Sequence, residues 1–67
     1  MNLKLLKLAR TKKGMTQKQM AEKLGFRDKS SYCLIENGKT QISISTMKRI
    51  IAVLQLSEDE AIKIFFA

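Results

Sequence analysis

The sequence predicts an all-α fold in which five short helices form a single domain over residues 1–67. Three observations support this class. The chain has no proline and only three glycines, and helix-forming residues dominate the segments between those glycines. Runs of β-branched residues are short, and apolar residues recur at helical spacing. A chain of this length buries about 60% of its unfolded surface, which suffices for one small core.

The first helix is expected over residues 3–13, because Asn2 can serve as its N-cap and Gly14 can end it in a left-handed conformation. One face of this segment is expected to pack on the core: Leu3, Leu6, Ala9 and Arg10. Leu5 and Leu8 widen the apolar stripe, which indicates a second packing neighbour.

Two further helices are expected on either side of a short turn. One covers residues 17–24 after the N-cap Thr16, and the other covers residues 29–37 after the N-cap Asp28. The turn opens with Gly25, which can adopt a positive φ without a Cβ clash. A helix, a tight turn and a second helix predict a helix-turn-helix, whose second helix can lie in the major groove of DNA.

A fourth helix is expected over residues 44–54, with Ser43 as its N-cap. Its apolar residues repeat at helical spacing: Ile44, Met47, Ile50, Ile51 and Leu54. The motif Ser57-Glu58-Asp59-Glu60 is a capping box that opens a fifth helix, and its acidic side chains suit the positive end of the helix dipole.

The fifth helix is expected to present Ala61, Ile62 and Phe65 on one face, which leaves Ile64 pointing outward. Phe65 and Phe66 are expected to close the core against two leucines of the first helix, Leu5 and Leu8. A contact of the two phenylalanines with a second copy of the chain is the alternative.

The net charge of +7 is unevenly distributed. Residues 1–49 hold twelve Lys or Arg against three Asp or Glu, which gives +9, and residues 50–67 hold Lys63 against three acidic residues, which gives −2. A concentrated basic surface is typical of a polyanion binder, although a solubilising surface would give the same count.

Composition excludes several function classes. The chain has no histidine and one cysteine, Cys33, so it can form neither an intrachain disulfide nor a His-dependent triad or zinc site. A lone thiol is typical of a reducing cytoplasm. No run approaches the ~20 apolar residues of a membrane span, and residues 1–10 lack the features of a secretory signal. We therefore expect a cytoplasmic protein with no metal, cofactor, membrane contact, small-molecule substrate or enzymatic activity.

The helix over residues 29–37 has two distinct sides at 100° per residue. Tyr32 and Ile35 point to the core, and we expect the tyrosine hydroxyl at the rim of the core. The opposite side carries Lys29, Ser30, Cys33 and Leu34. The lysine can donate to guanine or to phosphate, the serine can bond several base edges, and the cysteine and leucine can meet a thymine methyl group.

Two stretches of the chain carry a recognisable pattern of residues. They are Thr16-Gln17-x-x-Met20-Ala21-x-x-Leu24-Gly25-Phe26 and Ile35-Glu36-Asn37-Gly38-Lys39. On these residues, with Arg10 before Gly14, the sequence resembles the Cro/repressor-type domain, also called the XRE family. The resemblance covers about residues 3–60 and implies a compact lambda-repressor-like fold that binds double-stranded DNA. The turn before residue 29 is one residue longer than the commonest family turn, which leaves the register of residues 27–30 against the family open.

The resemblance also implies roles for individual residues. Gln17 is expected to bond a phosphate and brace the recognition helix, and Arg10 and Glu36 are expected to form a partly buried ion pair. The segment Lys39-Thr40-Gln41 is expected to contact backbone phosphate. Leu34 stands where many members of the family carry a polar or basic residue.

The sequence therefore predicts a sequence-specific transcriptional regulator, such as a repressor of phage or mobile-element type. The alternative is a protein-interaction module on the same fold, such as an antitoxin or an inhibitory partner. Three basic residues around the recognition helix, Arg27, Lys29 and Lys39, favour DNA as the partner.

We expect a homodimer on a palindromic operator, because one helix-turn-helix reads too few base pairs for useful specificity. The expected dimer surface lies at the end of the fourth helix and on the fifth. Its apolar residues are Leu56, Ile62, Ile64, Phe65 and Phe66.

Overall fold

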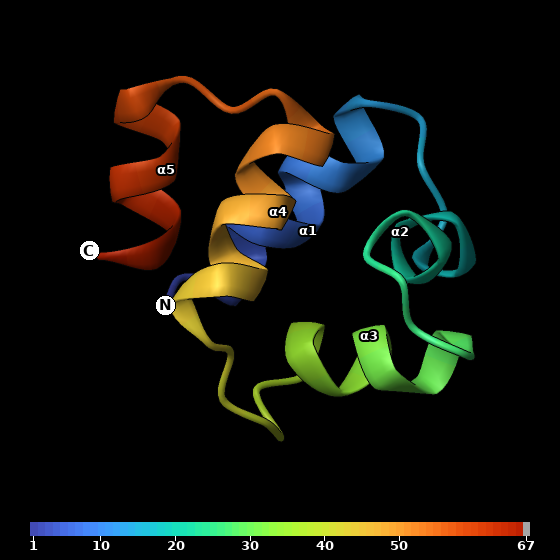
Figure 1. Cartoon of the computed structure of the whole chain (residues 1–67). Helices are drawn as coiled ribbons and strands as arrows, with labels where there is room; N and C mark the ends of the chain where they lie inside the picture. Colours follow the sequence, from blue (N-terminus) through green and yellow to red (C-terminus); the bar gives the residue numbers. More distant parts are fainter. Residues whose placement is uncertain (67) are drawn as a thin grey trace.

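The computed structural model describes residues 1–66 as five α-helices joined by short loops, with no β-strand in that range (Figure 1). The helices are α1 (Leu3–Lys12), α2 (Gln17–Lys23), α3 (Lys29–Glu36), α4 (Ile44–Leu54) and α5 (Glu58–Phe65). The all-α prediction is confirmed. The first three helices end one residue before the predicted positions, because Lys13, Leu24 and Asn37 serve as their C-caps.

Each helix begins at a polar residue whose side chain accepts a backbone N–H of the first turn. These N-caps are the five predicted ones: Asn2, Thr16, Asp28, Ser43 and Ser57. Thr16 and Ser57 form complete capping boxes with Gln19 and Glu60. A cap satisfies donors that have no partner inside the helix, so these residues fix where each helix starts.

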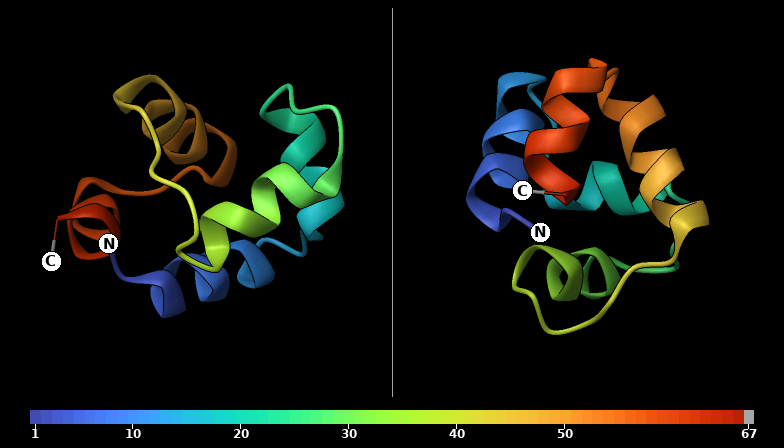
Figure 2. Two further views of the ribbon diagram at one scale, coloured as in Figure 1. Left: turned by 90° about the horizontal axis from the view of Figure 1, so that it is seen from below. Right: turned by 90° about the vertical axis from the view of Figure 1, so that its left-hand side faces the viewer.

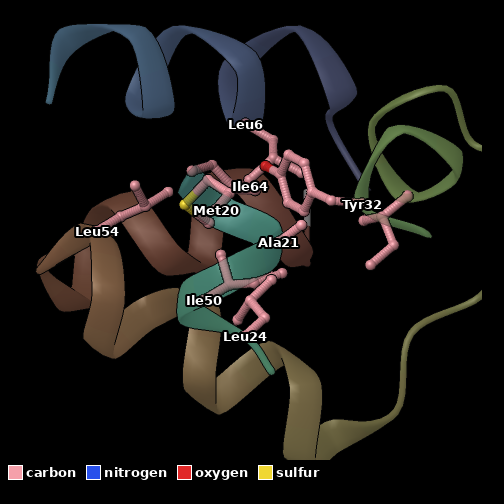
Figure 3. Close-up of a cluster of buried hydrophobic side chains, with 9 residues drawn as sticks. Leu6, Met20, Ala21, Leu24, Tyr32, Ile50, Leu54 and Ile64 are labelled. Carbon is pink, nitrogen blue, oxygen red and sulfur yellow. The ribbon is translucent and has the colours of Figure 1, made fainter. Parts of the chain in front are cut away.

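All five helices contribute side chains to one core, shown in part in Figure 3. Its buried residues are Leu6 of α1, Met20 and Ala21 of α2 with the C-cap Leu24, Tyr32 and Ile35 of α3, Ile50 and Leu54 of α4, and Ile64 of α5. Ile44, which was expected in the apolar stripe of α4, is exposed because it is the first residue of the helix and lies at its far end from the core residues Ile50 and Leu54.

The orientation of α5 corrects two predictions. Ile64 is 3% exposed and belongs to the core, whereas Ile62 is 49% and Phe66 is 69% exposed. The backbone N–H of Asn2 donates to the Ile64 carbonyl at 2.6 Å, which ties the start of the chain to the last turn of α5. The expectations that Ile64 points outward and that Phe66 closes the core are therefore wrong, and only Phe65 of the aromatic pair packs against the core.

The end of α3 packs tightly on the start of α1. Gly38 follows α3 with φ +70°, and a Cβ atom at this position would lie 2.8 Å from Leu3 Cδ1. The positive φ favours glycine here, whereas Leu3 Cδ1 is the end of a flexible side chain that could move aside.

The helices leave α3 on one face of the molecule. Figure 2 (left) shows this face, with α1 on one side of α3 and the segment that leads to α4 on the other. The helix α5 lies alongside α1, and the N-terminus lies next to α5, away from the start of α3 (Figures 1 and 2). Among the described helices, none has the length and hydropathy of a membrane span.

Candidate DNA-binding interface

The turn between α2 and α3 is held by backbone and side-chain hydrogen bonds. Gly25 has φ +81°, and its successor Phe26 donates its backbone N–H to the Ala21 carbonyl at 2.8 Å. Arg49 of α4 donates to the Leu24 carbonyl at 3.2 Å. Together these contacts fix the angle at which α3 leaves the turn.

Asp28 organises the first turn of α3. Its Oδ1 accepts hydrogen bonds from the Ser30 hydroxyl at 2.5 Å, the Ser30 N–H at 3.0 Å and the Ser31 N–H at 3.4 Å. The Ser30 hydroxyl and these amides lower the pKa of the exposed Asp28 carboxyl. The Ser30 hydroxyl proton is engaged in this cap, so Ser30 presents its oxygen to a ligand as an acceptor.

Arg10 of α1 and Glu36 of α3 form a buried salt bridge with two hydrogen bonds. Arg10 Nε lies 2.5 Å from Glu36 Oε2, and Nη2 lies 3.2 Å from Oε1. The third nitrogen of the guanidinium, Nη1, donates to the Met15 carbonyl at 2.6 Å. This arginine therefore joins α1, the segment before α2 and the end of α3 in one network.

The Arg10–Glu36 salt bridge shifts the pKa values of both side chains. Burial is the largest single influence on Glu36 and alone would raise its pKa, but Arg10, through its hydrogen bonds and its charge, together with the neighbouring Tyr32 and Gln17 side chains, outweighs burial and leaves that pKa below its ordinary value. The hydrogen bond to Glu36 raises the pKa of Arg10. Both side chains are therefore charged at neutral pH.

Gln17, at the first position of α2, reaches across to α3. Its Nε2 donates to Glu36 Oε1 at 3.4 Å, and its Oε1 accepts from Cys33 Sγ at 2.9 Å. The half-buried thiol of Cys33 therefore lies against α2, on one flank of α3, and not at the centre of its exposed face.

Tyr32 lies deeper than the sequence predicts. Its ring is fully buried beside Leu6 of α1 (Figure 3), and its hydroxyl makes no hydrogen bond with any residue in the range 1–66. Burial raises the pKa of this hydroxyl, and the nearby Glu36 carboxylate raises it further. The expectation of a hydroxyl at the rim of the core is wrong, because α1 covers the position.

Most of the predicted DNA-contacting residues are exposed on or beside α3. They are Arg27 in the turn, Lys29, Ser30 and Leu34 on the helix, and Lys39, Thr40 and Gln41 after it. Leu34 is 47% exposed. On one flank of α3, hydrogen bonds bring together four residues: Arg10, Gln17, Cys33 and Glu36. Leu34, Thr40 and Gln41 lie together on the other flank.

Two grooves run along these flanks. The basic groove, between α1, α2 and α3, is lined by Lys7, Arg10, Gln17, Lys18 and Lys29, together with the loop before α2. The neutral groove lies between α3 and the start of α4. Its polar lining is Ser31, Thr40, Gln41, Ser43 and Thr46, and its apolar lining is Phe26, Leu34, Ile35 and Ile42.

Sequence reasoning did not identify several polar residues of these grooves as DNA contacts, among them Lys7, Lys18, Ser31 and Thr46. The two lysines belong to the basic part of the chain, but their position beside Lys29 depends on how α1 and α2 pack against α3. The two hydroxyl residues carry no motif in the sequence.

No group of three or more metal-ligating side chains occurs among residues 1–66. The arrangement instead offers an exposed helix, three lysines on one side of it and hydroxyl groups on the other. These groups match the chemistry of phosphates and base edges in duplex DNA.

A model of the helix-turn-helix family matches residues 6–60 of the chain. The matched range contains α2, the turn and α3, and it extends from α1 into the first turn of α5. Comparisons with curated proteins and with solved structures give no significant match.

Proposed function

Because the chain belongs to the Cro/repressor-type helix-turn-helix family of DNA-binding regulators, we propose that it reads one double-stranded DNA sequence with α3 in the major groove. The observation that carries the proposal is the exposed side of α3, where Lys29 and Leu34 stand clear of the core. The Arg10–Glu36 salt bridge holds the end of this helix to α1, and the Asp28 cap holds its first turn.

Each exposed side chain suits a particular contact. Lys29 can donate to guanine O6 and N7 or to phosphate, and Leu34 can pack on a thymine methyl group. Ser30 can accept from an exocyclic amino group, since its own proton is bound to Asp28. Arg27 and Lys39 lie beside the helix and are exposed, so they are suited to phosphate contacts.

Binding alone can account for a regulatory effect. A protein that occupies a site excludes other proteins from it, and we therefore assign the chain the role of a repressor of phage or mobile-element type. The excess of +9 within residues 1–49 supports affinity for DNA of any sequence, and the side chains of α3 add the preference for one sequence.

We further propose that two copies bind a palindromic operator as a homodimer, with half-sites about 34 Å apart. The surface that supports this is the outer side of α5, where Ile62 and Phe66 are one helical turn apart and both exposed. These two exposed apolar side chains are available for a contact with another molecule. A protein-interaction module would use the same surface for a different partner.

Selection of bound sites from a random duplex library tests the proposal. The expected result is a palindromic consensus whose half-sites are spaced by one helical turn of DNA. Enrichment of an asymmetric short site would support DNA reading and contradict the dimer, and no enrichment at low salt would contradict the proposed function itself.

A further inference from the structure

The helix α3 contributes residues to both the basic groove, through Lys29, and the neutral groove, through Ser31, Leu34 and Ile35, and therefore lies between them. The major groove of DNA is bounded by two sugar–phosphate strands. When α3 lies in the major groove, one strand therefore passes over each flank of the helix. Each of the two flanking grooves faces one of the two strands.

The two grooves differ in charge. Lys7, Lys18 and Lys29 line the basic groove, each from a different helix or helix start. None of the described residues that line the neutral groove is charged. This difference is notable on a protein with a net charge of +7, because both grooves would face equally charged strands.

The neutral groove nevertheless offers hydrogen-bond donors on both of its walls. On the α4 wall, Ser43 Oγ donates to Thr46 Oγ1 at 3.1 Å, which leaves the hydroxyl proton of Thr46 available to a further acceptor. On the α3 wall, Ser31 is exposed. Thr40 and Gln41 complete the polar rim, and Leu34 joins this groove to the exposed side of α3.

We propose that the neutral groove holds one sugar–phosphate strand of the bound duplex through uncharged groups, with Ser31 and Thr46 as donors to phosphate oxygen. This inference rests on the proposed function and adds to it a difference in the protein groups that contact each of the two strands. Three lysines line the groove that faces one strand, whereas hydroxyl and amide groups line the groove that faces the other. Hydroxyl side chains are ordinary phosphate ligands in protein–DNA complexes.

The difference has a measurable consequence. A lysine that neutralises a phosphate releases a counterion, so its contribution to affinity falls as salt rises. A neutral donor releases none, so its contribution does not depend on salt. Loss of a neutral contact should therefore lower affinity at every salt concentration without a change in the slope of log affinity against log salt.

The test compares four proteins on a duplex that carries one half-site of the selected sequence, so that the effects of one protomer are measured. Each protein is titrated over a range of KCl concentrations. They are the parent, the double variant Ser31→Ala/Thr46→Val, the control Ser45→Ala and the cationic comparison Lys18→Ala. Ser45 is exposed in the same turn of α4 as Thr46 but does not line the neutral groove. Thermal unfolding of each variant shows whether it is folded.

We expect the double variant to bind about 5- to 150-fold more weakly at every salt concentration, since each of the two lost hydrogen bonds contributes roughly 0.5–1.5 kcal/mol. Its slope should equal that of the parent. Lys18→Ala should reduce the slope by about 0.9, which corresponds to one phosphate. Ser45→Ala should bind like the parent.

The inference is overturned if the folded double variant binds as tightly as Ser45→Ala, or if its slope decreases as that of Lys18→Ala does. Should the double variant fail to fold, Ser31→Ala alone decides the question, because Ser31 is exposed and its substitution leaves α4 unchanged. A parent that binds no duplex contradicts the proposed function, and that result is distinct from both outcomes above.

Discussion

At the residue scale, the molecule depends on a few polar groups that are buried for structural reasons. Arg10 and Glu36 are both more than nine-tenths buried, and their salt bridge joins the first helix to the recognition helix. Removal of one partner of such a pair leaves the other charged and unpaired, at a cost of about 3–5 kcal/mol. Tyr32 is buried next to this network without a hydrogen bond of its own.

The first prediction concerns pH. The folded-state pKa of Glu36 lies below its ordinary value of 4.5, so the folded protein keeps this carboxylate charged where the unfolded chain begins to protonate it. Its contribution to stability is present above pH 4.5 and is lost as the pH falls through the lowered pKa. Denaturant unfolding of the parent should show this decrease, and Glu36→Gln should show a smaller one. Equal pH dependence in both proteins would mean that the carboxylate is not paired in solution.

The second prediction concerns the hydroxyl of Tyr32. Because this buried group has no partner among the described residues, its removal in Tyr32→Phe loses no hydrogen bond and avoids a desolvation cost. The free energy of unfolding should stay the same or rise by up to about 1 kcal/mol. A decrease of more than about 1 kcal/mol in urea unfolding would show that the hydroxyl donates to Glu36.

At the element scale, the starts of the helices were predictable and the orientation of the last helix was not. The five N-caps were found because capping is a local interaction, decided by residues within three positions of each other. In α5 the residues Ala61, Ile64 and Phe65 share one face, whereas Ile62 and Phe66 share another. Both faces are apolar, so the sequence pattern alone could not decide which one is buried. The contact of α5 with the start of the chain decides it.

In the candidate interface, the exposed residues of single helices were predictable from the sequence, and the grooves between helices were not. The exposure of Lys29 and Leu34 follows from the period of one helix, and the resemblance to a known family pointed to Arg10 and Glu36. The two grooves beside α3 were not predictable, because each is formed by residues far apart in the chain. Lys7 and Lys29 line one groove, for example, only because α1 packs against the helix-turn-helix.

The third prediction separates two lysines of the recognition element. Lys29 lies at the start of α3, and Lys39 follows its end. Lys39→Ala should weaken binding to all duplexes about equally, because phosphate contacts carry no sequence information. Lys29→Ala should also relax the preference at one base position, at a cost of about 1–3 kcal/mol there. Competition with single-base variants of the selected site measures both effects. Identical losses on specific and random DNA for the two variants would show that Lys29 does not read a base.

At the scale of the whole molecule, the proposed functions are divided between two ends. The face with α3 and its grooves is the proposed DNA surface, and the outer side of α5 is the proposed dimer surface. The three acidic side chains at the start of α5 are half of the six Asp and Glu residues of the chain. This charge disfavours DNA near α5 and leaves that end to a protein contact.

The fourth prediction tests the dimer surface. Ile62→Ser and Phe66→Ser replace exposed side chains outside the core, so both variants should remain folded. Each should lower the affinity for a full palindrome while binding to a single half-site stays at the parent level, which serves as the internal control. Sedimentation with palindromic DNA gives the number of protomers. One protomer per palindrome, or unchanged affinity in both variants, would contradict this dimer surface.

The central claim is that the protein binds duplex DNA through the basic face around α3, and a salt titration tests it most directly. The fifth prediction is that log affinity for the selected duplex falls linearly with log salt concentration. If the dimer neutralises about 6–10 phosphates, affinity should fall by about 10³–10⁵ between 50 and 200 mM salt. No binding at low salt, or an affinity that does not change with salt, would contradict the claim.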